Sequence, residues 1–187
     1  MTSQTCPTFA FKTACVHDHL EFAESLIEEY GYDININSQD DYSFRYACAN
    51  GNLEIMEFLL SIEDNKINLV AQDGFAIRSA CKHQHYSVVE FLLDFDDADE
   101  YSMGMFRYLQ KAYTEQCGAG NYKSVMFMLE YFKDYLHSCE KMLDAGAMTH
   151  ICRNGYIKTL KIMMQHLDIP ATYFIVRNGI KEALRNN

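Results

Sequence analysis

The chain has 187 residues, a length that allows one domain or at most two. Its 26 acidic residues outnumber 16 lysines and arginines, giving a formal net charge of −10, which disfavours nucleic acid and anionic membranes as partners. No run of about 18 apolar residues occurs, and the opening MTSQTCPTF lacks the features of a signal peptide. We therefore expect a soluble protein of the cytoplasm or nucleus.

One motif recurs along the chain at nearly constant spacing. The stretch ACANGNLEIMEFLL at 47–60 returns as ACKHQHYSVVEFLL at 80–93, displaced by 33 residues. Its cysteine is repeated five times along the chain, as Cys15, Cys48, Cys81, Cys117 and Cys152. A period of this length indicates stacked structural repeats, each of which contacts only its neighbours.

Each copy of the motif predicts two helices. The residues up to the cysteine predict a short first helix, and the apolar spacing of Leu53, Met56 and Leu59 predicts an amphipathic second helix. A turn is expected between the two, at Asp18, Gly51, Gln84, Gly120 and Gly155. Connectors such as GYDININSQDD are rich in turn-forming residues and are expected to project as hairpins.

The whole chain, 1–187, is therefore predicted to be one all-α helix-turn-helix solenoid. In chain order, the predicted repeats span residues 8–40, 41–73, 74–106, 107–143 and 144–171. A shortened C-terminal capping repeat is expected at 172–187, because IVRNGIKEAL echoes ICRNGYIKTL.

The second and third copies resemble ankyrin repeats, and the first fits the same frame. NGNLEIMEFLL is similar to the family's second helix, and GYDININSQD is similar to its Gly-Ala-Asp-Val-Asn connector. The Thr-Pro-Leu-His signature is replaced by YSFRYAC and FAIRSAC, with Arg45 and Arg78 at the histidine position. This variant resembles ankyrin repeats of large DNA viruses and their amoebal hosts. The resemblance implies a non-enzymatic protein that binds other proteins, as an adaptor or in host interaction.

The five repeated cysteines are interpreted as small buried apolar residues, whereas Cys6 and Cys139 fall outside the pattern and are expected to be more exposed. The triplets Cys15-x-His17-x-His19 and Cys81-x-His83-x-His85 have the spacing of metal ligands. Alternate residues at a helix end point in different directions, so no metal site is expected. No cofactor motif and no catalytic constellation occurs, and the chain is not expected to be an enzyme.

A column of basic residues also follows the repeat, at Lys12, Arg45 and Arg78. The favoured interpretation is structural: these side chains bind connector carbonyls or pair with nearby aspartates. The alternative is an anion-binding stripe, which requires an exposed and unpaired column.

Charge is unevenly distributed along the chain. Residues 1–100 hold 5 basic and 19 acidic side chains, a balance of −14, and residues 101–187 hold 11 and 7, a balance of +4. An acidic first half favours a protein partner with a basic surface. The alternative function is a structural protein that assembles with itself, its acidic front meeting the basic back of a neighbour. Light scattering across a salt series separates the two.

The favoured function is a monomeric interaction module whose concave face and connector tips bind the partner. The residues just after each repeated cysteine differ between copies and are expected to point toward the partner. The predicted partner-binding residues are His17, Asp40, Asp41, Asn50, Asp73, Lys82, His83, Arg153 and Asn154.

Overall fold

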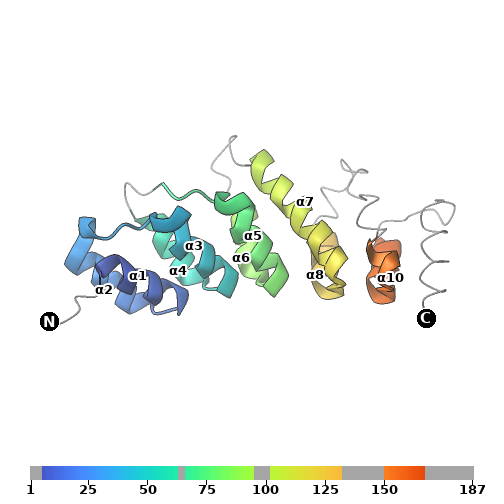
Figure 1. Ribbon diagram of the computed structural model, residues 1–187, viewed down its shortest axis with the longest axis horizontal. Coiled ribbons are helices and arrows are strands. Elements are labelled where there is room, and N and C mark those ends of the chain that lie inside the picture. Colours follow the sequence, from blue (N-terminus) through green and yellow to red (C-terminus); the bar gives the residue numbers. More distant parts are fainter. Residues whose placement is uncertain (1–5, 63–65, 95–101, 132–149, 167–187) are drawn as a thin grey trace. The chain divides into compact units, whose positions relative to one another are not determined.

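The computed structural model describes residues 6–62, 66–94, 102–131 and 150–166 (Figure 1). Within these ranges all regular structure is helical, and no strand occurs. The chain divides into two compact units, residues 1–108 and 109–187, which are described separately. The predicted cap at 172–187 and Cys139 lie outside the described residues, as do parts of the predicted fourth and fifth repeats.

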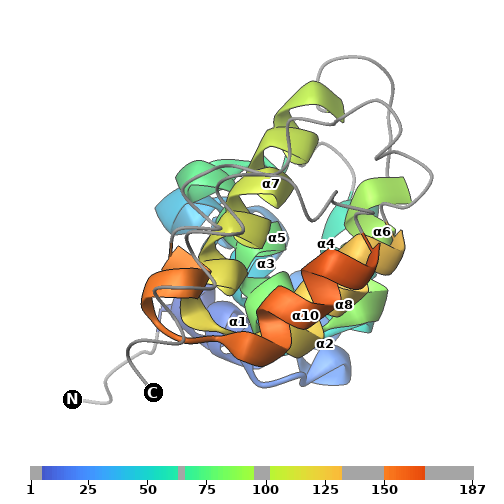
Figure 2. The same ribbon diagram turned by 90° about the vertical axis from the view of Figure 1, so that its right-hand side faces the viewer.

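The first unit contains three pairs of helices. They are α1 (Pro7–Val16) with α2 (Leu20–Tyr30), α3 (Ser38–Asn50) with α4 (Leu53–Ser61), and α5 (Ala71–His83) with α6 (Tyr86–Asp94). The first helices α1, α3 and α5 pack side by side, and each also packs on its own second helix. Figure 2 shows the two resulting layers, with α1, α3 and α5 in one and α2, α4 and α6 in the other. This is the predicted helical solenoid.

The second unit continues the same pattern. It holds the end of α7 (Ser102–Ala119), then α8 (Tyr122–Tyr131), a helical turn at 150–153 and α10 (Ile157–His166), which packs on α8. Helix α7 has 18 residues and is longer than the other first helices, and it begins before the predicted repeat start at 107.

The predicted turn within each repeat is confirmed in all five copies. Asp18, Gly51, Gln84, Gly120 and Gly155 all adopt left-handed conformations, with φ between 60° and 82°. The residue after each donates its backbone N–H to the carbonyl five residues earlier, at 2.9–3.0 Å. This bond satisfies a carbonyl that the end of the first helix would leave without a partner. The same local geometry therefore directs every second helix back along the first.

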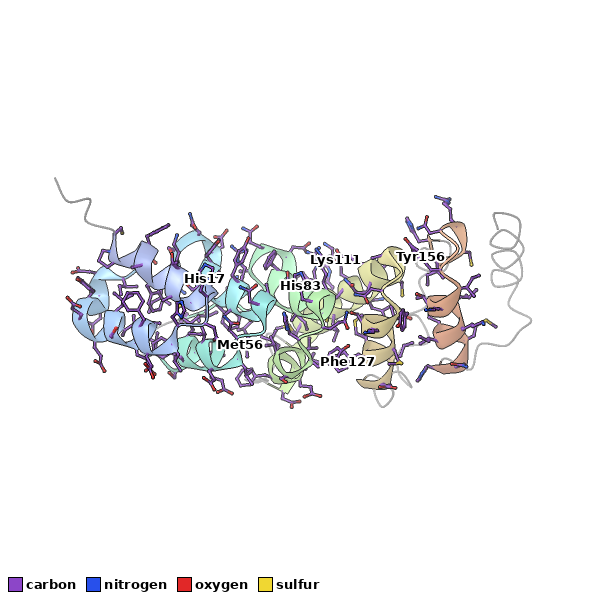
Figure 3. The ribbon with its side chains drawn as sticks, turned by 90° about the horizontal axis from the view of Figure 1, so that it is seen from below. His17, Met56, His83, Lys111, Phe127 and Tyr156 are labelled. Atoms are coloured by element: carbon purple, nitrogen blue, oxygen red, sulfur yellow. The ribbon has the colours of Figure 1, made fainter. Side chains whose placement is uncertain are left out.

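The core lies between the two helix layers and uses the same positions in each repeat. The five repeated cysteines are all buried, with at most 2% of each residue exposed. In the second repeat Phe44, Met56 and Leu59 are buried as well, and Cys48 Sγ lies 3.4 Å from Met56 Sδ. The labelled Met56 lies inside the first unit in Figure 3. The predicted role of the cysteines as small core residues is confirmed.

The connectors differ from the expected hairpins. Residues Gly31–Asp33 form a short 3-10 helix, η1, and no strand pairing is present in the described connector residues. Instead, three consecutive residues are left-handed at 39–41, and the same occurs at 72–74. These turns lead directly into the right-handed parts of α3 and α5.

None of the helices in the described part of the chain combines the length and apolar composition needed to cross a lipid bilayer.

Candidate protein-binding surface

The turn at 39–41 is held by the first helix that follows it. Arg45 is buried, and its Nε donates to the Asp40 carbonyl at 2.6 Å while a terminal nitrogen donates to the Gln39 carbonyl at 2.9 Å. Three consecutive left-handed residues are costly for L-amino acids because Cβ crowds the backbone. Charge-assisted bonds to two of their carbonyls help to offset that cost.

In the third repeat Arg78 also bonds to a carbonyl of the left-handed turn, over a longer distance than Arg45 does in the second. Arg78 donates to the Asp73 carbonyl at 3.1 Å and forms an ion pair with its carboxylate at 3.3 Å. Lys12 in the first repeat instead reaches forward, bonding to Gln39 Oε1 at 3.0 Å and lying over the Tyr42 ring. The basic column is thus engaged within the protein, as the structural interpretation predicted, and is not an unpaired anion-binding stripe.

The predicted acidic contact residues occupy different environments. Asp41 is buried, with 5% exposed, and its carboxylate accepts from Asn37 Nδ2 at 2.6 Å and from the Asn68 backbone N–H at 3.0 Å. Its expected place among the partner-binding residues is corrected, because it joins two successive connectors inside the first unit. Asp40 is exposed but accepts a hydrogen bond from Gln72.

The residues that follow the repeated cysteines are arranged in a consistent way. The second residue after each cysteine is exposed in all five repeats, whereas the residue between them varies from buried in Ala49 to exposed in Lys82 and Arg153. In the first unit the exposed residues of this set are His17, Asn50, Lys82 and His83, which we call the inner face. In the second unit they are Ala119, Arg153 and Asn154.

Within the inner face, Asn50 also has a structural role. Its Nδ2 donates to the Val16 carbonyl at 2.9 Å, which links α3 to the end of α1. Substitution of Asn50 would therefore loosen the stacking of the first two repeats as well as alter the surface. His17 and His83, labelled in Figure 3, lie at the ends of α1 and α5 and are the more suitable positions for testing recognition.

The two histidine pairs do not converge on a common point. The ring centroids of His17 and His19 are 6.5 Å apart, and those of His83 and His85 are 6.1 Å apart. The preceding cysteine of each triplet is buried in the core. Among the described residues, no group of three histidine, cysteine or acidic side chains is placed to hold a metal ion.

Burial sets the chemistry of the thiols. It raises the pKa of Cys15, Cys81 and Cys117 to about 12 and also raises the pKa of Cys48. Cys6 is exposed, and hydrogen bonds from the backbone of Thr8 and Phe9 lower its pKa. Because the thiolate is the reactive species, the two classes should differ in reactivity.

We expect Cys6 to be the fast-reacting thiol among the described cysteines. In a Cys139→Ser background at pH 8, Ellman's reagent should modify Cys6 rapidly and the five repeated cysteines only after unfolding in urea. A Cys6→Ser variant in that background should show no fast phase. A fast phase that remains in this variant would contradict the burial of the five repeated cysteines.

Charge on the second helices is segregated by unit. Helices α2, α4 and α6 contain no lysine or arginine, and their exposed acidic residues are Glu21, Glu24, Glu28, Glu29, Glu54, Glu57, Glu90 and Asp94. Helix α10 in the second unit instead exposes Lys158 and Lys161. Among the described residues of the first unit, eight of the exposed acidic side chains lie on the second helices, and the others are Asp18, Asp33, Asp40 and Asp73.

Two features were missed by sequence reasoning. The first is the left-handed turn, whose only signal is the recurrence of QDD at 39–41 as QDG at 72–74. The second is the exposure of Phe9 and Phe22. The next two repeats bury the position of Phe22, at Ile55 and Val88, and half-bury that of Phe9, at Tyr42 and Phe75.

Comparison with known proteins agrees with this geometry. The family model of ankyrin repeats, in three copies, matches residues 11–104. No curated protein and no solved structure matches the chain. The family match covers half of the 187 residues and runs from the middle of α1 through the other helices of the three pairs of the first unit. The chain belongs to the ankyrin repeat family.

Proposed function

We propose that this protein binds a partner protein through the inner face and the adjoining connector turns. Ankyrin repeats are in general protein-interaction modules, and solenoids offer extended surfaces of this kind. The observation that carries the proposal is the exposed residue that follows each buried cysteine, once in every repeat. The cysteine frame stays constant while the residues beside it change, so the surface can be specific without altering the core.

The proposed partner is a protein with a basic surface, and not nucleic acid or a membrane. Eight exposed acidic side chains on α2, α4 and α6 give the first unit a negative potential. Such a potential increases the rate of encounter with a basic protein and repels polyanions. In this proposal the second helices steer the approach, and the inner face makes the contact.

The wider setting of the protein is also a proposal. Arg45 and Arg78 stand where the family's signature histidine would be. This form of the repeat signature resembles that of viral ankyrin proteins, and it supports the proposal that the protein acts as an adaptor in host interaction. A monomer in the cytoplasm or nucleus fits that role.

The test compares two sets of surface variants on an identified partner. We expect His17→Ala and His83→Ala together to weaken binding by about tenfold or more, as loss of a contact residue does. Ser87→Ala, on the exposed side of α6, should leave affinity unchanged. Affinity is measured by titration with the partner, obtained by affinity capture from the cells that express the protein.

Both variants should unfold at the same urea concentration as the wild type, since the substituted residues are exposed. If Ser87→Ala abolishes binding while the histidine variant binds normally, the partner lies on the second helices and the proposal is wrong.

Self-assembly is the alternative function. It is favoured by the opposite charge of equivalent helices, with acids on α2, α4 and α6 and Lys158 and Lys161 on α10. Association of this kind weakens as salt is added, so light scattering across a salt series distinguishes it from a monomeric binding module.

A further inference from the structure

The first repeat exposes an unusual amount of aromatic surface. In the described parts of the chain, six large apolar residues are exposed, and four of them lie between residues 9 and 32. They include Phe9, with 60% exposed, and Phe22, with 52% exposed. Exposed aromatic side chains of this size are common at binding sites because they bury much apolar area with little loss of side-chain freedom.

The repeat frame shows what Phe22 lacks. Its equivalents in the next two repeats are Ile55 and Val88, of which no more than 1% is exposed. Its neighbours Ala23 and Leu26 are buried like their own equivalents, so α2 is packed normally on its other sides. We infer that the position of Phe22 faces the preceding repeat, because it is exposed only in the first repeat, where the described part of the chain holds no helix before α1 (Figure 1).

Phe9 leads to the same conclusion from the other helix layer. Its equivalents are Tyr42 and Phe75, and each contacts the repeat before it. Lys12 of the first repeat lies 5.4 Å above the Tyr42 ring, and the ring centroid of Tyr46 in the second repeat lies 5.4 Å from that of Phe75. Phe9 and Phe22 thus belong to one open stacking surface, which we call the N-terminal face.

The charge around this face restricts what can cover it. The first repeat exposes Asp18, Glu21, Glu24, Glu28, Glu29 and Asp33. Glu29 lies seven residues after Phe22 and so on the same side of α2. Lys12, the one lysine or arginine in residues 6–37, is engaged with Gln39 and Tyr42 of the second repeat. The N-terminal face is therefore apolar with an acidic surround.

We propose that the N-terminal face docks a basic amphipathic helix of a partner protein. In the later repeats the equivalents of Phe9 contact the first helix of the preceding repeat, Tyr42 through Lys12 of α1 and Phe75 through Tyr46 of α3, so this side of the repeat is suited to a helix. Lysines flanking the apolar side of that helix would meet the acidic surround. A second copy packed through the same face would instead place the glutamates of α2 against those of its partner. This surface is separate from the inner face and does not depend on it.

The experiment uses a synthetic helical peptide of leucine and lysine, with leucines along one side, titrated into the full chain. We expect the double variant Phe9→Ser and Phe22→Ser to bind it about tenfold or more weakly, since two apolar contacts are lost. Ile157→Ser, which removes a similarly exposed apolar residue from α10, should have no effect. A peptide in which glutamate replaces lysine should not bind.

Charge variants give a second readout that leaves the apolar residues intact. Glu21→Lys with Glu29→Lys should weaken binding of the lysine peptide, and raising the salt concentration should have a similar effect. Glu54→Lys with Glu57→Lys makes the same change of charge on α4, away from the face, and should have a smaller effect.

Three results would overturn the proposal. Equal peptide affinity of the wild type and the phenylalanine variant would place binding elsewhere. A wild-type dimer that Phe22→Ser converts to a monomer would identify a second copy as the occupant. A tenfold gain in peptide affinity on removal of residues 1–5 would identify the chain's own beginning as the occupant.

Discussion

Phe44→Ala should lower the free energy of unfolding by about 3–5 kcal/mol, the usual cost of removing a fully buried aromatic ring. Phe44 has 1% exposed and lies in the same core as Cys48, Met56 and Leu59. In a solenoid each repeat contacts only its neighbours, so a cavity in the middle repeat of the first unit weakens the helix pairs on both sides of it. The measurement is urea unfolding followed by circular dichroism in the far ultraviolet.

Glu57→Ala is the matched control for this change. Glu57 lies on the same repeat but is exposed, and we expect a change within about 0.5 kcal/mol. A loss below about 1 kcal/mol for Phe44→Ala would show that this side chain is not part of a packed core and would contradict the helix register of the second repeat.

Gly51→Ala is expected to have the second large effect, because two penalties act at one position. Gly51 has φ +82°, a left-handed conformation that costs roughly 1–2 kcal/mol for a residue with Cβ. A Cβ there would also lie 2.4 Å from His85 Nδ1, so the imidazole of the third repeat would have to move. Urea unfolding should therefore show a loss larger than the backbone penalty alone.

Gly118→Ala should change stability in the opposite direction. Gly118 lies within α7, and a Cβ at this position would meet no atom within 4 Å, so alanine should stabilise the helix by up to about 1 kcal/mol.

The variant His85→Ala separates the two penalties at Gly51. The loss of stability caused by Gly51→Ala should be smaller in that background. An unchanged cost would show that only the backbone conformation matters.

Sequence reasoning predicted the repeating parts of this fold because they are local and recur five times. The buried cysteines and the left-handed turn residues sit at a fixed spacing, and a glycine at three of the five turns marks the conformation directly. At the other two turns, Asp18 and Gln84 do not by themselves indicate a left-handed conformation. Their conformation could be predicted only from their place in the frame.

The parts that were not predicted depend on contacts between segments far apart in the sequence. Asp41 looks like an exposed connector residue, yet it is buried because Asn68, 27 residues later, brings a backbone N–H to its carboxylate. The left-handed turn at 39–41 has no propensity signal, since Gln and Asp seldom adopt this conformation in succession. The exposure of the candidate residues was therefore predicted better at the helix ends than at the connectors.

The bonds from Arg45 to the Gln39 and Asp40 carbonyls also bear on the order of folding. The turn is unfavourable by itself, and the arginine that holds it is positioned only once the helix around it has formed. We therefore expect the turn and the first part of α3 to form together. Arg78 links the turn at 72–74 to α5 in the same way, through the Asp73 carbonyl, and we expect each turn to open together with its helix in hydrogen-exchange measurements.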